Sequence, residues 1–528
     1  MDMDKYNEYR KHTYKDAGVE KGFTTKALIS ILALILALAL TLTSCGSSAG
    51  TGTASVTSVT AEATDNAVSK SKMFTERDLS GDYDESEAET ITLSGSSAET
   101  SAASGVTISG STITITAEGV YIVSGSLDDG QIIVDTDDSA KVQIVLKDAS
   151  VTSSDSAALY VKSADKVFVT LAEGTENTLA NGGSFIADGD TNIDGAVFAK
   201  DDIVFNGSGS LIIDSPAGHG IAGNDDVKFA GGTYTINAAE HGVKANDSVR
   251  VAEADVTIVS GADKDGIHVS DDADEEEGTG SDSFFYMADG SLTISAGDDG
   301  IHADASVIIE GGTIAVSKSY EGIEGLSISI SGGSTTVIAS DDGLNAGSSI
   351  EISGGNVHIT AGGDGIDSNG SVAVSGGYTV VEGPSQGDTS VLDFNGTASI
   401  TGGTFIGTGG AGMGENFTDA EQGLITVNVG SQSAGSTVTL RDASGNVIAE
   451  IAPGLDYAAV YISAESMAQG ETYTLTAGSY SESITLTDII YSTINGGMTG
   501  VPGGGQTMPG GNTQGGMPQG GPGQGERP

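Results

Sequence analysis

The chain has 528 residues, enough for two or three domains, and a formal net charge of −52 from 21 Lys and Arg against 73 Asp and Glu. So few basic residues argue against nucleic acid as a partner, because phosphate contacts need Lys and Arg. The sole cysteine, Cys45, excludes a disulfide scaffold and a cysteine-rich zinc site.

The N-terminal segment has the pattern of a bacterial lipoprotein signal peptide. Basic residues precede an apolar run over residues 27–42, which is shorter than the roughly 20 residues of a membrane span. The run ends in Leu42-Thr43-Ser44-Cys45, where the thiol of Cys45 would receive a diacylglyceryl group. We expect cleavage of residues 1–44 and a lipid anchor at the extracellular face of the cell membrane. An ordinary signal anchor with an incidental cysteine is the alternative.

Both ends of the remaining chain have the composition of spacers. Residues 45–85 are rich in Ser, Thr and Ala and then acidic, which predicts a flexible tether. Residues 493–528 are rich in Gly, Pro and Gln, which predicts a disordered tail.

Between these spacers a repeat of about 22 residues dominates the sequence. Its signature runs from His219-Gly220-Ile221 to Asp364-Gly365-Ile366, with glycines separated by 22, 24, 34, 22, 21 and 22 residues. Gly-Gly pairs follow ten or eleven residues later, and each pair precedes a short alternating strand. This period predicts an all-β fold, a right-handed parallel β-helix over residues 86–414, in which glycines supply positive φ angles at corners. Residues 421–490 then form a predicted small β-sandwich-like module that covers the open end.

Two sequence columns of the repeat carry the chemistry, and we expect both to point outward. The residue before each repeat glycine forms the pre-glycine column, and the residue two after it forms the post-glycine column. The first reads His219, His241, Asp265, Asp299, Glu321, Asp342 and Asp364, and the second reads Ala222, Lys244, His268, His302, Glu324, Asn345 and Asp367. Further carboxylates, Asp263, Asp298 and Asp341, lie just upstream.

Carboxylates stacked on successive rungs need counter-ions. At a rung spacing of about 4.8 Å, two charges repel by roughly 0.9 kcal/mol in water and roughly 3.5 kcal/mol at the effective dielectric of a protein surface. Calcium takes six to eight oxygen ligands at about 2.3–2.6 Å and suits an oxygen-only set. We therefore predict calcium ligands in the two columns and their upstream neighbours: Asp263, Asp265, Asp298, Asp299, Glu324, Asp341, Asp342, Asp364 and Asp367. A solvated acidic face without a fixed ion is the alternative.

A second calcium candidate and the histidines complete the predicted site. Asp190, Asn192, Asp194 and Asp201 match the spacing of a calcium loop, although the same residues are also consistent with another corner of the repeat. Stacked histidines, His219 with His241 or His268 with His302, could hold a transition metal, but we interpret them as structural. We expect His268, His302 and Asn345 to contact substrate. With no Trp in the chain, the candidates for sugar stacking are Tyr234, Tyr286, Tyr320 and Tyr378, which packing alone would also explain.

Several segments resemble a known family, the bacterial secreted carbohydrate-binding domain-containing β-helix proteins, which are related in fold to pectate lyases. The resemblance rests on residues 74–81, 129–134 and 191–198 and on the Asp-Gly-Ile repeats, and it covers residues 74–490. It implies calcium sites in the β-helix and binding of cellulose-like or polygalacturonate-like polymers.

The hypothesis that follows is a cell-surface lipoprotein that binds polysaccharide through a calcium-loaded face. A calcium-dependent polysaccharide lyase is the first alternative, with Lys244 or Lys264 as the base that removes a proton beside a uronate carboxylate. A structural surface protein or adhesin is the second.

The anchor gives the first prediction. Changing Cys45→Ala removes the only thiol that can carry lipid, so the variant should be released into the medium or left unprocessed. Cell fractionation with labelled fatty acid measures this, and a lipid-modified, cell-bound variant would show that the anchor lies elsewhere.

Overall fold

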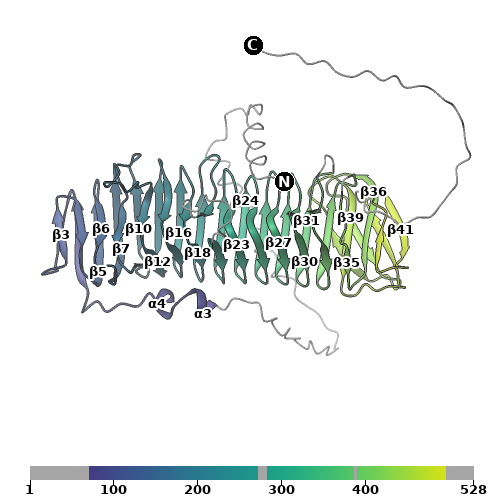
Figure 1. Cartoon of the computed structure of the whole chain (residues 1–528), viewed down its shortest axis with the longest axis horizontal. Coiled ribbons are helices and arrows are strands. Elements are labelled where there is room, and N and C mark those ends of the chain that lie inside the picture. The colour runs from purple at the N-terminus through teal and green to yellow at the C-terminus, as the bar shows by residue number, and fades with distance from the viewer. Residues whose placement is uncertain (1–69, 271–281, 386–388, 413, 495–528) are drawn as a thin grey trace, which may run out of the picture. The chain divides into compact units, whose positions relative to one another are not determined.

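The structure is a computed structural model that describes residues 70–270, 282–385, 389–412 and 414–494. Within these ranges the chain is almost entirely β-strand, and the predicted parallel β-helix is confirmed (Figure 1). No helix in the described ranges is long and apolar enough to cross a membrane. The predicted signal peptide, Cys45, the first part of the tether, most of the acidic insert after Ser270 and nearly all of the tail lie outside the described residues.

Three strips of parallel strands run along the β-helix. Strip 1 contains β4 (Thr112–Ile115), β6 (Gln131–Asp135), β8 (Leu159–Ser163), β11 (Gly195–Ala199), β14 (His219–Gly223), β17 (Val243–Ala245), β20 (Ile267–Val269), β29 (Ile366–Ser368), β32 (Leu392–Phe394) and the first parts of β23 (Ile301–Ile309), β25 (Ile323–Ile330) and β27 (Leu344–Ile352). Strip 2 contains the second parts of those three strands, the first parts of β5 (Gly119–Leu127) and β7 (Lys141–Ser153), and β9 (Lys166–Leu171), β12 (Asp202–Gly207), β15 (Asp226–Phe229), β18 (Ser248–Val251), β21 (Phe284–Met287), β30 (Ser371–Val374), β33 (Ala398–Ile400) and β35 (Asp419–Ala420).

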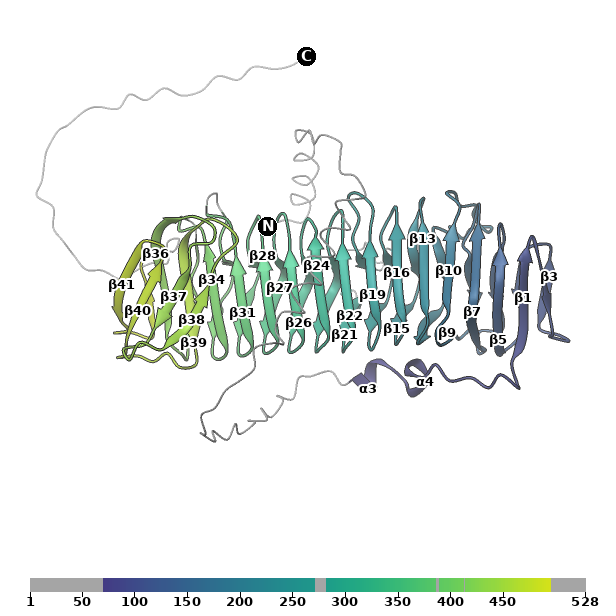
Figure 2. The ribbon, with the colours of Figure 1, turned by 180° about the vertical axis from the view of Figure 1, so that it is seen from behind.

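Strip 3 is prominent from behind (Figure 2). It contains β1 (Glu89–Gly95), the second parts of β5 and β7, β10 (Glu176–Asn181), β13 (Ser210–Ser215), β16 (Thr233–Ala238), β19 (Asp255–Val259), β22 (Ser291–Ser295), β24 (Thr313–Lys318), β26 (Ser334–Ile338), β28 (Asn356–Thr360), β31 (Tyr378–Glu382) and β34 (Thr404–Gly409). Antiparallel partners β2 (Ser97–Thr100) and β3 (Val106–Ser109) pair with β1 and β4 at the N-terminal end.

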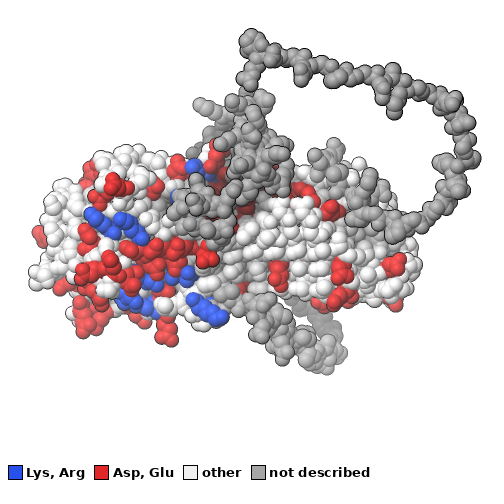
Figure 3. All heavy atoms as spheres, in the orientation of Figure 1, with Lys and Arg blue, Asp and Glu red and all other residues white. Residues whose placement is uncertain are grey.

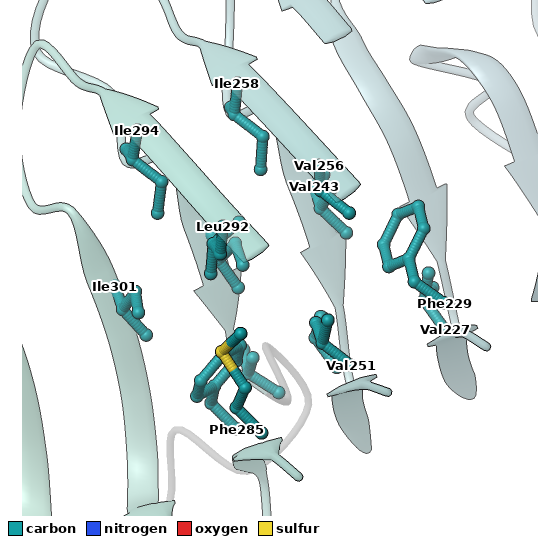
Figure 4. Close-up of a cluster of buried hydrophobic side chains, with 14 of the residues drawn as sticks. Val227, Phe229, Val243, Val251, Val256, Ile258, Phe285, Leu292, Ile294 and Ile301 are labelled. Carbon is teal, nitrogen blue, oxygen red and sulfur yellow. The ribbon is translucent and has the colours of Figure 1, made fainter. Parts of the chain in front are cut away.

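The core is built from side chains that the three strips turn inward. Along β19, exposed and buried residues alternate, so that the side chains of Val256 and Ile258 point into the core of the β-helix. They meet Val243 of strip 1 and Val251 of strip 2, and all four are at most 2% exposed (Figure 4). Identical positions of successive rungs therefore form apolar columns, which explains why Val and Ile recur at the repeat spacing.

The C-terminal module extends the last rung and then folds over it. Strands β39 (Tyr457–Ala464), β36 (Leu424–Gln432) and β42 (Ile490–Ser492) continue the sheet from β34. A separate antiparallel sheet contains β38 (Val447–Ile451), β37 (Val438–Arg441), β40 (Thr472–Ala477) and β41 (Tyr480–Thr485). Apolar residues of both sheets share one core, as in a small β-sandwich.

The structure corrects the predicted C-terminal end of the flexible tether. Residues 70–85 are ordered as a strap that includes α3 (Lys70–Met73) and α4 (Glu76–Leu79) and contacts the β-helix. Phe74 is buried, the Arg77 guanidinium lies 4.4 Å from the centre of the Phe168 ring, and Asp78 is 0% exposed with Lys166 Nζ at 3.5 Å. The polar composition of residues 70–85 suggests a spacer, but these contacts hold the segment against the β-helix.

Glycines serve two different purposes in the repeat. The second glycine of each Gly-Gly pair has positive φ, for example 73° at Gly333, as expected for a corner. The repeat glycine instead permits close approach of rungs. A Cβ at Gly343 would lie 2.2 Å from Ile359 Cγ2 and 2.6 Å from the carbonyl oxygen of Gly365.

We therefore expect Gly343→Ala to lower the melting temperature, because overpacking of a core costs about 1–3 kcal/mol. Gly412→Ala is the matched control, since a Cβ there meets nothing within 4 Å. Equal melting temperatures for the two variants, measured by circular dichroism, would contradict this explanation.

Candidate functional site

The pre-glycine and post-glycine columns lie side by side along strip 1. Strand register aligns each member of the post-glycine column with the next and extends this column from Phe198 to Asp393. Backbone hydrogen bonds between successive rungs, such as that from Gly242 N to the carbonyl oxygen of Asp265, align the pre-glycine column. A third column, here called the outer column, contains Glu240, Lys264, Asp298, Tyr320 and Asp341, and backbone hydrogen bonds from Asp298, Tyr320 and Asp341 to the preceding rung align it. The three columns form one continuous face.

The pre-glycine column is buried, which corrects the expectation that it points outward. Asp265, Asp299 and Glu321 are 4%, 1% and 4% exposed. Most of these side chains reach toward the next rung and accept a hydrogen bond from a backbone N–H there. Asp265 Oδ1 accepts from Asp299 N at 3.0 Å, and Asp342 Oδ1 accepts from Asp364 N at 2.6 Å. The position thus favours a side chain that accepts a hydrogen bond, and this explains the mixture of Asp and His.

Four histidines stack at the start of this face. The ring centres of His219, His241, His268 and His302 lie 5.3, 4.4 and 5.1 Å apart in sequence order. His219 and His241 use Nδ1 to accept the N–H of the next rung, at 3.2 and 2.9 Å. Burial lowers the pKa of His219 to about 4 and that of His241 to about 3, so both rings are neutral at physiological pH. These contacts support the structural interpretation of the two rings.

His302 acts as an internal cation. Its Nδ1 lies 2.7 Å from Glu324 Oε2 and 3.6 Å from Asp299 Oδ2, and its Nε2 lies 3.1 Å from Asp304 Oδ1. Burial alone would lower the pKa of His302, but hydrogen bonds to Asp299, Asp304 and Glu324 outweigh it and raise the pKa well above its ordinary value. A charged imidazole therefore compensates the carboxylates of this part of the face, where His268 Nδ1 also lies 2.6 Å from Asp265 Oδ2.

The remaining rungs carry carboxylates without such a cation. We call Asp341, Asp342, Asp364, Asp367 and Asp393 the carboxylate cluster. Within the described residues none of the five forms an ion pair with Lys, Arg or His. Burial, followed by the neighbouring carboxylates, raises the pKa of Asp342 to about 8 and that of Asp367 to about 7. An oxygen-only set with uncompensated charge fits a hard cation such as calcium.

Other predicted ligands are distributed around this cluster. Asp265, Asp298 and Asp299 each offer an oxygen within 4.8 Å of the others and form a second possible oxygen site. Asp263 is exposed on the turn before Lys264, outside the three columns. Asn345 is 9% exposed and donates to Glu321 Oε2 at 2.7 Å, which limits its contact with any ligand.

The predicted calcium loop does not form a single site. Strand β11 separates Asp194 from Asp201, and its five residues span about 16 Å at about 3.3 Å per residue. Asp201 Oδ2 instead accepts the N–H of Ala164 at 3.0 Å. The spacing rule assumes a compact loop, and the intervening strand makes Asp201 unable to share an ion with Asp194.

Asp190, Asn192 and Asp194 instead line an open pocket of about 350 Å³ with Lys244. Its other lining residues are Thr191, Phe198, Lys200, Ala222, Gly223, Asn224 and Asn246. Sequence reasoning missed Lys200, Asn224 and Asn246, although they recur at the rung spacing directly after the strip 1 strands. Lys264, the other candidate base, lies outside this lining and has Glu240 Oε2 at 2.5 Å from its Nζ.

The tyrosines divide into packing residues and exposed ones. Tyr234 and Tyr286 are 0% exposed and cannot meet a sugar. Tyr320 is 36% exposed and lies in the outer column between Asp298 and Asp341, whereas Tyr378 is 40% exposed on strip 3. Tyr320 is therefore the candidate stacking residue beside the carboxylates.

Comparison with known proteins covers most of the residues that form this face. Residues 109–365 match the family model of the carbohydrate-binding domain-containing protein. The resemblance seen in the sequence is confirmed. A carbohydrate-binding domain-containing protein of Acetivibrio thermocellus is 34% identical over 122 residues, which are 23% of this chain and 43% of the relative, so the match spans less than half of that relative. The solved structure of the polysaccharide lyase-like protein from C. thermocellum shares 31% identity and a TM-score of 0.41, over 44% of this chain and 91% of that one.

The shifted pKa values predict a stability that falls as pH rises from about 6.5 to about 8 when divalent cations are chelated. The pKa of Asp342 is raised from 3.8 to about 8, and that of His302 is raised above 6.5, so the folded chain holds more protons than the unfolded chain in this window. His219 and His241 act in the opposite direction only below pH 6.5, because their pKa values are lowered. Thermal melts in chelator at the two pH values measure the difference.

Asp342→Asn should reduce this pH dependence, because it removes the charge and keeps an oxygen that can accept the N–H of Asp364. Asp128→Asn, at an exposed aspartate elsewhere, is the control. A melting temperature that rises between pH 6.5 and 8 would contradict the assignment.

Proposed function

We propose that this protein binds polysaccharide along the face of the three columns, with calcium held at the carboxylate cluster. The observation that carries the proposal is the set of half-buried aspartates Asp341, Asp342, Asp364 and Asp367, which form no ion pair with a described basic side chain. The match of residues 109–365 to a carbohydrate-binding domain family supports a sugar polymer as the ligand.

The cluster supplies the oxygen ligands that calcium prefers, and an ion would have to draw them together, because no three of its ligand oxygens lie within 4.8 Å of one another. These aspartates would hold the ion, and bound calcium would offer coordination positions to the carboxylates or hydroxyls of a sugar. Tyr320 presents an exposed ring in the adjacent outer column, where the face of a pyranose can stack. His302 stays with its own carboxylates and positions Glu324 rather than the ligand.

The geometry also suits a long, regular ligand. Successive rungs advance by about 4.8 Å, so equivalent side chains recur at even intervals along the axis. A polymer lying along the axis therefore meets equivalent positions on each rung. Lipid anchoring through Cys45 at the outer face of the membrane would present this surface to extracellular polysaccharide, and residues 46–69 would separate the two.

A lyase activity is the second candidate, favoured by the pocket that brings Lys244 near Asp190 and Asp194. A lysine beside a bound uronate could remove a proton as general base. For that role the pocket favours Lys244 over Lys264, which lies outside the lining with its Nζ 2.5 Å from Glu240 Oε2.

The test removes two of the five charges of the cluster without removing hydrogen-bond acceptors. The double variant Asp342→Asn, Asp367→Asn should lose most calcium-dependent binding to polygalacturonate and most of the rise in melting temperature that calcium gives. Linkage makes that rise equivalent to about 2.7 kcal/mol when free calcium is a hundred times its dissociation constant. Affinity electrophoresis and thermal melts, each with calcium and with chelator, measure both effects.

The control is Asp128→Asn, Asp137→Asn, which makes the same change of charge at exposed positions. Wild-type binding that persists unchanged in chelator would contradict the calcium proposal. The same samples report on lyase activity through the ultraviolet absorbance of unsaturated uronate ends.

A further inference from the structure

The pocket at the start of the post-glycine column exists because one side chain of that column is missing. The column reads Phe198, Ala222 and Lys244 on β11, β14 and β17, and every later member is larger than alanine. Gly223 follows Ala222, so β14 contributes almost no side-chain volume at and after the post-glycine position. The result is an open pocket of about 350 Å³ across three rungs.

The lining of this pocket differs from the carboxylate cluster in charge. Lys200 and Lys244 border it on the rungs that flank Ala222. Most other described lysines are held by carboxylates, as Lys228 is by Asp226 at 2.9 Å, but Lys200 has no ion pair with a described residue. On the face that Figure 3 shows, the visible Lys and Arg side chains lie over the N-terminal half of the β-helix. The pocket lining thus has two lysines beside the two carboxylates of Asp190 and Asp194, whereas the carboxylate cluster has only acidic side chains.

Amide and carboxylate groups complete the lining. Asn224 and Asn246 follow the strands on successive rungs, and neither side-chain amide makes a hydrogen bond to a described residue. Asn192 Nδ2 donates to Asp194 Oδ2 at 3.1 Å, which orients that carboxylate on the opposite side. Amides and carboxylates together can donate to and accept from sugar hydroxyls.

We infer that this pocket binds one carboxylated sugar residue of the polysaccharide without calcium, with Lys200 and Lys244 on its carboxylate and the asparagine amides on its hydroxyls. The volume lies at the lower end of the range for small-ligand pockets, which suits one or two rings. The inference rests on the proposed function, because the pocket and the carboxylate cluster share the post-glycine column and would contact one polymer. It adds an anion-binding point that the calcium proposal does not include.

The test uses trigalacturonate and its methyl ester, which has the same shape and no charge. In chelator, calorimetry should detect trigalacturonate binding to the wild-type chain and at least about tenfold weaker binding of the ester. The variant Lys200→Gln, Lys244→Gln should weaken trigalacturonate binding by a similar factor. Ala222→Leu, which fills the pocket and leaves its charge unchanged, should also weaken it.

The matched control is Lys141→Gln, Lys147→Gln, which removes two half-exposed lysines on other rungs and should bind as the wild type does. Unchanged melting temperatures show that the pocket variants fold. The inference is overturned if the wild type does not bind trigalacturonate in chelator, if the ester binds equally well, or if the Lys200 and Lys244 variant binds like the control.

The two proposals fail separately. The variant Asp342→Asn, Asp367→Asn should keep full trigalacturonate binding in chelator, because its changes lie several rungs away from the pocket. Loss of that binding would place the anion site at the carboxylate cluster and overturn the inference. Binding of the whole polymer that is equally strong with calcium and with chelator would instead contradict the calcium proposal and leave the pocket results unaffected.

Discussion

The structure depends on one constraint, the in-register stacking of rungs about 4.8 Å apart. In the core of the β-helix this stacking is favourable, because Val and Ile side chains of successive rungs pack on one another and are buried. On the outer side it is unfavourable wherever the repeated residue is acidic, since neighbouring charges repel by roughly 3.5 kcal/mol at the effective dielectric of a protein surface. Each acidic column therefore requires a means of compensating its charge.

Two such means occur on this face, one in the pre-glycine column and one in the adjacent post-glycine column. In the first half of the face, neutral His219 and His241 accept the same backbone N–H that an aspartate would accept, and the charged ring of His302 compensates the carboxylates around it. In the second half of the pre-glycine column, Asp342 and Asp364 accept backbone N–H groups but pair with no basic side chain of the described residues. Only protons or a bound cation can compensate them, and this half is where the calcium proposal applies.

The sequence predicted what depends on the period and missed what depends on side-chain direction. A 22-residue spacing of Gly, Val and Ile suffices for the rungs and the core, because register makes equal positions adjacent. The repeat spacing could not show that the side chains of Asp265 and Asp299 reach toward the next rung and are buried there. The order of residues 70–85 was missed because a few contacts, such as Phe74 in its apolar cluster, override a polar composition.

The candidate site was predicted unevenly for the same reason. The repeat correctly placed Asp342, Asp364 and Asp367 on adjacent rungs, because equal positions of the repeat lie next to each other. Asp201 was misplaced because a local motif was applied across a strand. The pocket was missed because its cause is an absence, the small side chain of Ala222 in a column of larger ones.

The post-glycine column changes character along the axis, and this change gives the face a direction. It begins at Phe198 and Lys244 beside the pocket and ends at Asp367 and Asp393. An acidic polymer on this column would meet lysine at one end and a carboxylate cluster that needs a cation at the other. Carboxylates of different sugars in one polymer can bind at the two ends, by direct ion pairing with lysine at the first and through a shared cation at the second. Because the rung spacing fixes how many sugars separate the two points, the number of rungs between them, rather than any single residue, sets the length of glycan that can contact both.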